Sequence, residues 1–285
     1  MNIGFERVTD EEYKNQLLLL LERIHQICVA NNIRYTIAFG TLLGAVRHNG
    51  FIPWDDDIDI CMPREDYEVF ARVFPSKDGR YYTLDSRNSK YYYNCIYRVC
   101  DGDMVLPVKD IPQIDNLGAF IDIFVLDKWP TNDEELEYRY DRIRALVKKI
   151  RYALPASYYK EATGRQIIMR AIKFPLVLYY RYIVGFQKLR KSLDELVEQY
   201  NDKETGWRMV SSDNPRYAPW FIREEDLDKR VLISFEKLSV YAPENYDELL
   251  KRRYGDYMKL PPEEQRVTHH HFTPYWKKDS SSIIR

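Results

Sequence analysis

Apolar side chains recur at helical spacing near the start of the chain. The repeating positions are Tyr13, Leu17, Leu20, Leu21, Ile24 and Cys28. This period predicts an amphipathic helix from about Thr9 to Asn31, with Asp10 as its N-cap. The β-branched and aromatic run from Ile33 to Phe39 then predicts a strand, and Leu42 to Arg47 a short helix.

The pattern changes to strict alternation a few residues later. Ile58 and Ile60 alternate with Asp57 and Asp59, so Asp57 to Met62 is predicted to be a strand with one buried face. Pro63 follows at a position where proline opens helices well. Two further apolar segments, Tyr91 to Cys100 and Ala119 to Leu126, are predicted strands.

Helical periods dominate after residue 127. We expect Thr131 to cap a long charged helix ending near Arg151, a helical pattern from Tyr152 to Tyr200, and a helix from Tyr246 to Tyr254. Strands before helices indicate an α+β protein, a mixed β-sheet core flanked by helices with a helical elaboration. The predicted units are a catalytic core over 1–130, the helical elaboration over 131–205, and a C-terminal segment over 206–285 that completes the core and the donor pocket.

Composition excludes several classes of protein. With 285 residues and 45% hydrophobic side chains, the chain can bury a core and is not a disordered protein. Its 43 basic and 44 acidic residues give a net charge of -1, so we expect no nucleic-acid partner. No signal peptide is evident, and the apolar stretch from Phe174 to Phe186 is too short to span a bilayer. A cytoplasmic location is expected, and peripheral contact with the inner face of the membrane is a further expectation.

An acidic cluster is the first candidate for chemistry. Asp55, Asp57 and Asp59 share parity, so on an extended chain their carboxylates point to one face. Such carboxylates can converge on a divalent ion, and hard oxygen ligands favour Mg²⁺ or Mn²⁺. A solvated acidic turn is the alternative, but Ile58 and Ile60 indicate that the other face of the segment is buried.

A fourth carboxylate interrupts a later strand. Asp122 lies within an apolar run from Ala119 to Val125, and burying an unpaired carboxylate is costly. Its partner is expected to be an arginine, a cluster of backbone amides or a metal. Beside the first cluster, Asp122 becomes the natural third metal ligand.

A short turn precedes the acidic segment. Gly40 and Thr41 close one predicted element and open the next, where glycine permits close approach and free helix amides favour phosphate. An ordinary turn has the same composition. The Gly40–Thr41 turn lies shortly before the acidic segment, and this position favours phosphate binding.

These motifs together resemble the LicD family. The resemblance is carried by GTLLGAVRH at 40–48, by GFIPWDDDIDI at 50–60 and, later, by YGDYM at 254–258 and LPPE at 260–263. The family includes bacterial phosphocholine transferases and the animal fukutin-type ribitol-phosphate transferases, within the nucleotidyltransferase superfamily. The resemblance implies a nucleotidyltransferase-like core with Asp57, Asp59 and Asp122 as catalytic and metal-binding residues.

The resemblance also implies a reaction. An acceptor hydroxyl on a cell-surface glycan or teichoic acid precursor would attack the β-phosphorus of a CDP-linked alcohol, most simply CDP-choline, and release CMP. The family's acceptors include lipid-linked glycans, so a lipid-linked acceptor is expected here. Mg²⁺ (or Mn²⁺) would be held against the diphosphate, and Asp122 would complete the metal site or accept the proton. Gly40 and Thr41 would contact phosphate.

The remaining predicted donor contacts are basic residues. Arg47 and Arg98 would clamp phosphate, although a surface salt bridge explains each as well. His270, within the run from His269 to His271, is predicted to line the donor site, with metal binding by this run as the alternative.

Other interpretations use the same residues. The acids equally serve nucleotidyl transfer with pyrophosphate release, and a D-x-D pattern also occurs in glycosyltransferases; a non-catalytic binding module is a further alternative. The basic, aromatic segment 152–190 indicates either peripheral contact with an anionic membrane surface or an ordinary helical subdomain with a solvated basic face.

Overall fold

The computed structural model describes residues 5–107, 117–154, 172–212, 219–268 and 273–277. Its helices and strands, in chain order, are β1 (Phe5–Arg7), α1 (Asp10–Ala30), β2 (Thr36–Ile37), α2 (Phe39–His48), β3 (Asp59–Pro63), α3 (Arg64–Val73), β4 (Tyr81–Leu84), β5 (Ile96–Leu106), β6 (Leu117–Lys128), α4 (Asp133–Ala153), η2 (Tyr179–Val184), α6 (Phe186–Glu198), β7 (Trp207–Val210), β8 (Phe221–Arg223), α7 (Glu224–Asp228), β9 (Val231–Phe235), β10 (Leu238–Ala242), α8 (Tyr246–Tyr254), η3 (Glu263–Gln265) and β11 (Tyr275–Lys277).

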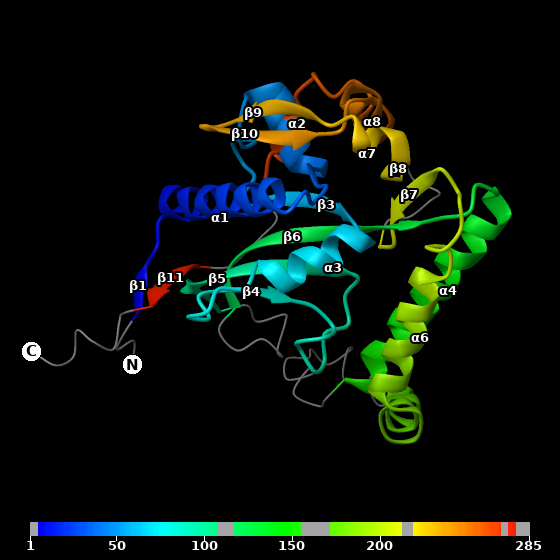
Figure 1. Ribbon diagram of the computed structural model, residues 1–285. Coiled ribbons are helices and arrows are strands. Elements are labelled where there is room, and N and C mark those ends of the chain that lie inside the picture. Colours follow the sequence, from blue (N-terminus) through cyan, green and yellow to red (C-terminus); the bar gives the residue numbers. More distant parts are fainter. Residues whose placement is uncertain (1–4, 108–116, 155–171, 213–218, 269–272, 278–285) are drawn as a thin grey trace, which may run out of the picture.

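A mixed sheet forms the centre of the molecule (Figure 1). Its main order is β1-β11-β5-β6-β3-β2, while β4 pairs with β5 and β7 links β6 to β8. The β3–β6 pair is parallel, and the other pairs in this sheet are antiparallel. A separate hairpin is made by β9 and β10. Mixed sheet and helices confirm the predicted α+β class.

The two faces of the sheet differ in burial. Helices α1 and α3 contact each other and β6, so both lie on one face. Beneath them Tyr97, Val99, Ile121 and Ile123 are buried. The alternate positions, Ile96 and Arg98 on β5, Asp122 and Phe124 on β6, and Asp59 on β3, are only half-buried. Because side chains alternate along a strand, these polar and half-buried positions share the opposite face, which we call the open face.

The long helices match their sequence signals, with corrected caps. Thr9, not the predicted Asp10, is the N-cap of α1: its hydroxyl accepts from the Glu12 backbone N–H at 3.2 Å, and Glu12 bonds back to the Thr9 N–H at 2.7 Å. This reciprocal capping box leaves Asp10 in the first turn. Asn132 rather than Thr131 caps α4, through a 3.0 Å bond from the Glu135 backbone N–H.

Several predicted strands are shorter than expected. Only Thr36–Ile37 of the predicted 33–39 strand pairs with a neighbour, and α2 already begins at Phe39. Strand β3 begins at Asp59, so Asp57 lies in the loop before it. Strand β5 begins at Ile96 rather than Tyr91. By contrast, α8 has the predicted bounds of Tyr246–Tyr254, and β6 contains the whole predicted 119–126 strand.

Helices α4 and α6, with η2 at their far end, project from one end of the sheet as a helical arm (Figure 1). The arm has its own buried cluster, which includes Trp129, Ile150, Leu193 and Met209. Within the described residues, none of the helices has both the length and the apolar content that crossing a membrane requires.

A buried arginine joins the arm to the sheet. Arg139 of α4 donates to the Lys128 carbonyl at 2.9 Å and to the Leu196 and Val197 carbonyls at 3.3 and 2.5 Å. Its guanidinium carbon lies 4.2 Å from the centre of the Trp129 ring. Burial lowers the pKa of Arg139 to about 10, so the three carbonyls and the ring together hold a charge removed from water.

We predict that Arg139→Ala lowers the free energy of unfolding by about 3 kcal/mol, because three buried carbonyls lose a charged donor at once. Urea denaturation followed by circular dichroism measures the change. Arg142→Ala is the matched control: Arg142 is exposed on the same helix, and the change should cost less than about 0.5 kcal/mol. Equal effects of the two changes would contradict the role of Arg139.

Candidate active site

The parallel pairing of β3 and β6 brings two of the predicted carboxylates together. Asp59 and Asp122 are partners in the register, 63 residues apart in sequence. The Asp122 backbone N–H donates to the Ile58 carbonyl at 3.1 Å, which fixes the two strands just where the acids lie. Both residues are on the open face, so their side chains lie beside each other there.

The start of α2 borders these acids. Phe39, its first residue, has a φ of 45°, a left-handed conformation that is costly for a bulky residue. The Phe39 ring packs 4.7 Å from Phe124 and 4.5 Å from Trp220, centre to centre. This packing stabilises the strained backbone, and the chain can therefore turn directly from β2 into α2.

Thr41 and Gly40 set the positions of two acids. The Thr41 hydroxyl accepts from the Asp59 backbone N–H at 2.8 Å, and the Asp59 carbonyl accepts from the Ala38 N–H at 3.0 Å. A Cβ built on Gly40 would lie 2.8 Å from Asp55 Oδ2, so only glycine lets that carboxylate lie where it does. The turn predicted to bind phosphate thus also holds the acidic segment in place.

The acids interact electrostatically. Burial of the carboxyl group, followed by the negative charges of Asp57, Asp122 and Asp55, raises the pKa of Asp59 well above its usual value. Three other carboxylates are therefore close enough to disfavour a negative charge on Asp59. A cation bound beside Asp59 would favour its ionised form and so remove the free-energy cost of ionising it.

Asp122 has a partner from the same face. Arg98 Nε donates to Asp122 Oδ1 at 2.7 Å, so of the partners that the sequence left open, the structure contains an arginine. The Arg98 guanidinium also lies 4.0 Å from the centre of the Phe120 ring. Its Nη1 is buried and has no hydrogen-bond partner among the described residues. Arg98 therefore holds Asp122 and still has a donor to offer.

The carboxylates do not form a complete metal cage by themselves. Among the residues that the structure describes, no three or more Asp, Glu, His or Cys side chains are arranged to hold a metal ion. Mg²⁺ is usually bound by one or two carboxylates together with substrate phosphates, so an incomplete protein cage fits a site that shares its ion with a diphosphate. Asp57, Asp59 and Asp122 as metal ligands remain a prediction.

Arg47, another predicted donor contact, bonds to groups other than the acids. Arg47 donates to the Tyr257 carbonyl at 2.9 Å and to His48 Nε2 at 2.9 Å, which ties α2 to the segment after α8. Burial lowers the pKa of Arg47. His270, with His269 and His271, lies outside the described residues.

Two tyrosines that the sequence did not identify as site residues also interact with the acids. Tyr254, at the end of α8, keeps part of its ring exposed, but desolvation of its hydroxyl raises its pKa to about 12, and Asp59 and Asp55 add to the shift while Arg253 opposes it. Burial and then the charges of Asp56, Asp57 and Asp122 raise the pKa of Tyr13 in α1. Tyr254 opens the YGDYM motif, which was a usable signal, whereas Tyr13 only repeats a helical apolar period.

We predict that Thr41→Val lowers the free energy of unfolding by about 1–2 kcal/mol, because the Asp59 backbone N–H loses its acceptor. Thr41→Ser keeps the hydroxyl and should stay within about 0.5 kcal/mol of the parent. Chemical denaturation of the three proteins in parallel measures both values. A valine variant as stable as the serine variant would rule out a contribution from this bond.

Comparison with known proteins identifies relatives of the chain. Residues 32–144 match the family model described as "LicD/FKTN/FKRP, nucleotidyltransferase domain". The chain is 29% identical over 274 residues to the lipopolysaccharide cholinephosphotransferase LicD of Haemophilus influenzae, a match that covers 93% of the chain and 97% of the relative. An uncharacterized protein of Rickettsia prowazekii is 34% identical over 123 residues, or 42% of the chain and 43% of that protein.

The matched region contains the acidic segment, Asp122 and the start of α4. A named transferase that matches along nearly its whole length defines the chain as a transferase enzyme. More narrowly, the family model and this relative together support a phosphotransferase of the LicD type, as the sequence motifs predicted.

Proposed function

We propose that this enzyme transfers phosphocholine from CDP-choline to a hydroxyl of a lipopolysaccharide-type cell-surface glycan and releases CMP. Similarity to a lipopolysaccharide cholinephosphotransferase along 97% of that protein supports the transferred group and the class of acceptor. The observation that carries the chemistry is the register pairing of Asp59 with Asp122 on the open face.

In the proposed reaction the acceptor oxygen attacks the β-phosphorus of the donor. A new bond forms between that phosphorus and the acceptor oxygen, the bond to the bridging oxygen breaks, and CMP leaves with the electron pair. The acceptor's proton passes to a carboxylate. Phosphoryl transfer of this kind depends mainly on positioning and on charge stabilisation.

The carboxylates have two proposed tasks. Asp57 and Asp59 would hold Mg²⁺ or Mn²⁺, which supplies charge neutralisation to the diphosphate when bound. The raised pKa of Asp59 supports this assignment, because the ionised site gains from a cation. Asp122 would complete the ion's ligands or accept the acceptor's proton, and Arg98 orients its carboxylate.

The donor phosphates would be bound by groups around the acids. Arg98 keeps a hydrogen-bond donor at Nη1, which suits a phosphate oxygen while Nε still holds Asp122. Gly40 and Thr41 lie at the start of α2, where backbone N–H groups favour phosphate. Arg47 contributes by holding the Tyr257 carbonyl, which brings the YGDYM motif to α2.

The decisive experiment incubates the enzyme with CDP-choline, Mg²⁺ and a lipopolysaccharide acceptor, and identifies the products by mass spectrometry. We expect CMP together with an acceptor heavier by one phosphocholine group. Pyrophosphate release from a nucleoside triphosphate, with no CMP from CDP-choline, would instead establish nucleotidyl transfer. CDP-ribitol and CDP-glycerol in parallel reactions test the choice of alcohol.

A second prediction separates the catalytic acid from a structural one. Asp59→Asn should lower kcat by on the order of 10³-fold. Without added metal the variant should be at least as stable as the parent, because a carboxyl group whose ionisation the surroundings oppose is gone. Steady-state CMP release and thermal unfolding in chelator measure the two effects.

Asp133→Asn is the matched control for this change. Asp133 is an exposed carboxylate in the first turn of α4, and its variant should keep the parental kcat. An Asp59→Asn protein with full activity, or one that unfolds far below the parent, would remove Asp59 from the proposed chemistry.

A further inference from the structure

The far end of the helical arm exposes an unusual set of apolar side chains. Between residues 172 and 185 no residue is buried. The large apolar side chains exposed here are Ile172, Phe174, Leu176, Leu178, Tyr179, Tyr182 and Ile183, with relative exposures from 40% to 74%. A soluble helix normally buries one apolar stripe, so an apolar helix end without a buried stripe indicates a surface that binds something.

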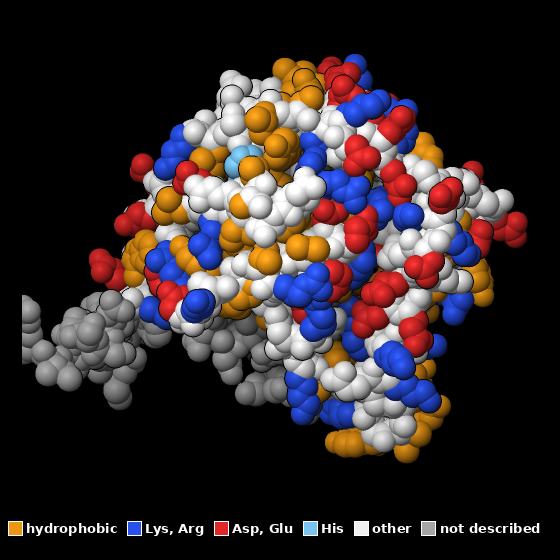
Figure 2. Space-filling model, in the orientation of Figure 1, with side chains coloured by type: hydrophobic (Ala, Val, Ile, Leu, Met, Phe, Trp, Pro, Cys, Tyr) orange, Lys and Arg blue, Asp and Glu red, His pale blue; other side chains and the backbone are white. Residues whose placement is uncertain are grey.

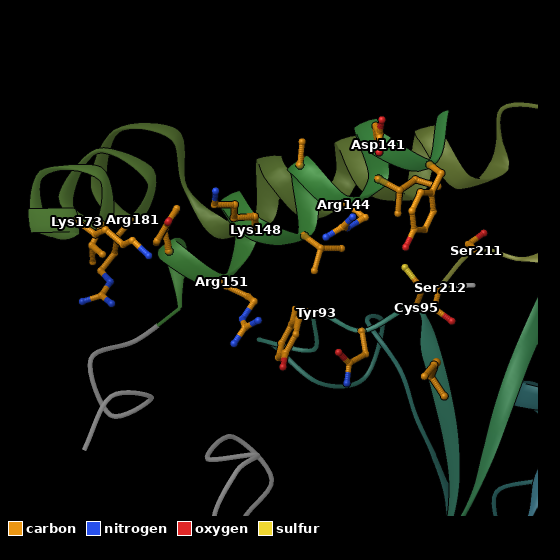
Figure 3. A pocket seen from close by; sticks show the side chains of 18 of the residues that line it. Tyr93, Cys95, Asp141, Arg144, Lys148, Arg151, Lys173, Arg181, Ser211 and Ser212 are labelled. Carbon is orange, nitrogen blue, oxygen red and sulfur yellow. The ribbon is translucent and has the colours of Figure 1, made fainter. Parts of the chain in front are cut away.

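Cationic side chains adjoin these apolar residues. A cleft of about 1330 Å³ lies between α4, residues 173–181 and the loop before β5. Its basic lining residues are Arg144, Lys148, Arg151, Lys173 and Arg181, against the single acidic residue Asp141. Figure 3 shows Arg144, Lys148 and Arg151 along α4, with Lys173 and Arg181 together at the far end. Figure 2 shows orange and blue side chains gathered at that lower end of the arm.

We propose that this end of the arm docks on an anionic lipid bilayer. The exposed apolar side chains of residues 172–183 would enter the boundary between headgroups and acyl chains. The cations of the cleft would bind lipid phosphates. Apolar groups flanked by Lys and Arg are the combination by which interfacial helices bind anionic membranes.

Charge complementarity selects the bilayer over a second copy of the chain. A symmetric dimer through this surface would place each cleft's five basic residues opposite those of its partner. Like charges brought together at an interface oppose association. An anionic bilayer instead supplies the opposite charge and an apolar phase at once.

The docking surface is also continuous with the open face. Ile96 lines the cleft and begins β5, two residues before Arg98, which holds Asp122. Successive same-face residues on a strand are roughly 6.5 Å apart. The cleft therefore ends one same-face residue from Arg98, and an acceptor held in the membrane would extend along it toward the acids.

The test is co-sedimentation of the purified chain with phosphatidylcholine vesicles with and without phosphatidylglycerol. We expect binding to the anionic vesicles that falls as salt is raised, because the lipid charge is screened. Arg144→Glu with Lys148→Glu should lower the bound fraction about tenfold. Phe174→Ser with Ile183→Ser should do the same through the apolar contact.

Arg142→Glu with Lys149→Glu is the matched control. It makes the same charge change on the same helix, at residues that do not line the cleft, and it should bind anionic vesicles like the parent. Thermal unfolding of each variant verifies the fold.

Three outcomes would overturn the proposal: equal loss in the control, full binding by the serine variant, or no preference for anionic vesicles. Dimerisation through the arm in lipid-free solution would assign the surface to a second copy instead. Vesicle binding is measured without donor or acceptor, so its failure is distinguishable from failure of the proposed transfer reaction.

Discussion

The parallel contact between β3 and β6 is the constraint on which the site depends. It is the one parallel pair described in a sheet otherwise antiparallel, and it aligns Asp59 with Asp122 although α3, β4 and β5 separate them in sequence. Because side chains alternate, a register shift of one residue would send Asp122 under α1 and α3, into the apolar layer that contains Ile121 and Ile123. That apolar layer fixes the register, so the hydrophobic core itself positions the acids.

Two features around this pair lower the stability of the folded protein. Asp59 is a carboxyl group in a negative environment, and Phe39 has a backbone conformation that bulky residues avoid. Each is held by its neighbours: Thr41 and Ala38 by hydrogen bonds to the Asp59 backbone, and Phe124 and Trp220 by ring packing on Phe39. Local conflicts that the surrounding structure keeps in place are typical of sites under functional constraint.

The sequence predicted long elements better than short ones. Helices α1 and α8 and strand β6 follow from strong periods or apolar runs, whereas β2 and β3 are short because ladder pairing, not local propensity, sets their ends. The alternation of 57–60 correctly indicated a buried face but extended the strand to Asp57, which lies in a loop. The sequence predicted an arginine as one of three possible partners of Asp122, but it did not predict that the arginine is Arg98. That contact depends on the antiparallel pairing of β5 with β6, which joins residues far apart in the chain. Tyr13 had no local signal, because its apolar period is that of any core residue.

The position of β11 has a consequence for how the chain acquires its structure. Tyr275–Lys277 lie between β1 and β5, so Phe5 at the start of β1 pairs with Lys277, 272 residues later in the chain (Figure 1). On the ribosome, this ladder cannot close until Tyr275–Lys277 have been synthesised. The edge of β5 that β11 covers stays open for the same interval, and unpaired strand edges favour aggregation. This part of the sheet thus closes long after β1 is synthesised, and the nascent chain would depend on chaperones that shield the edge until then.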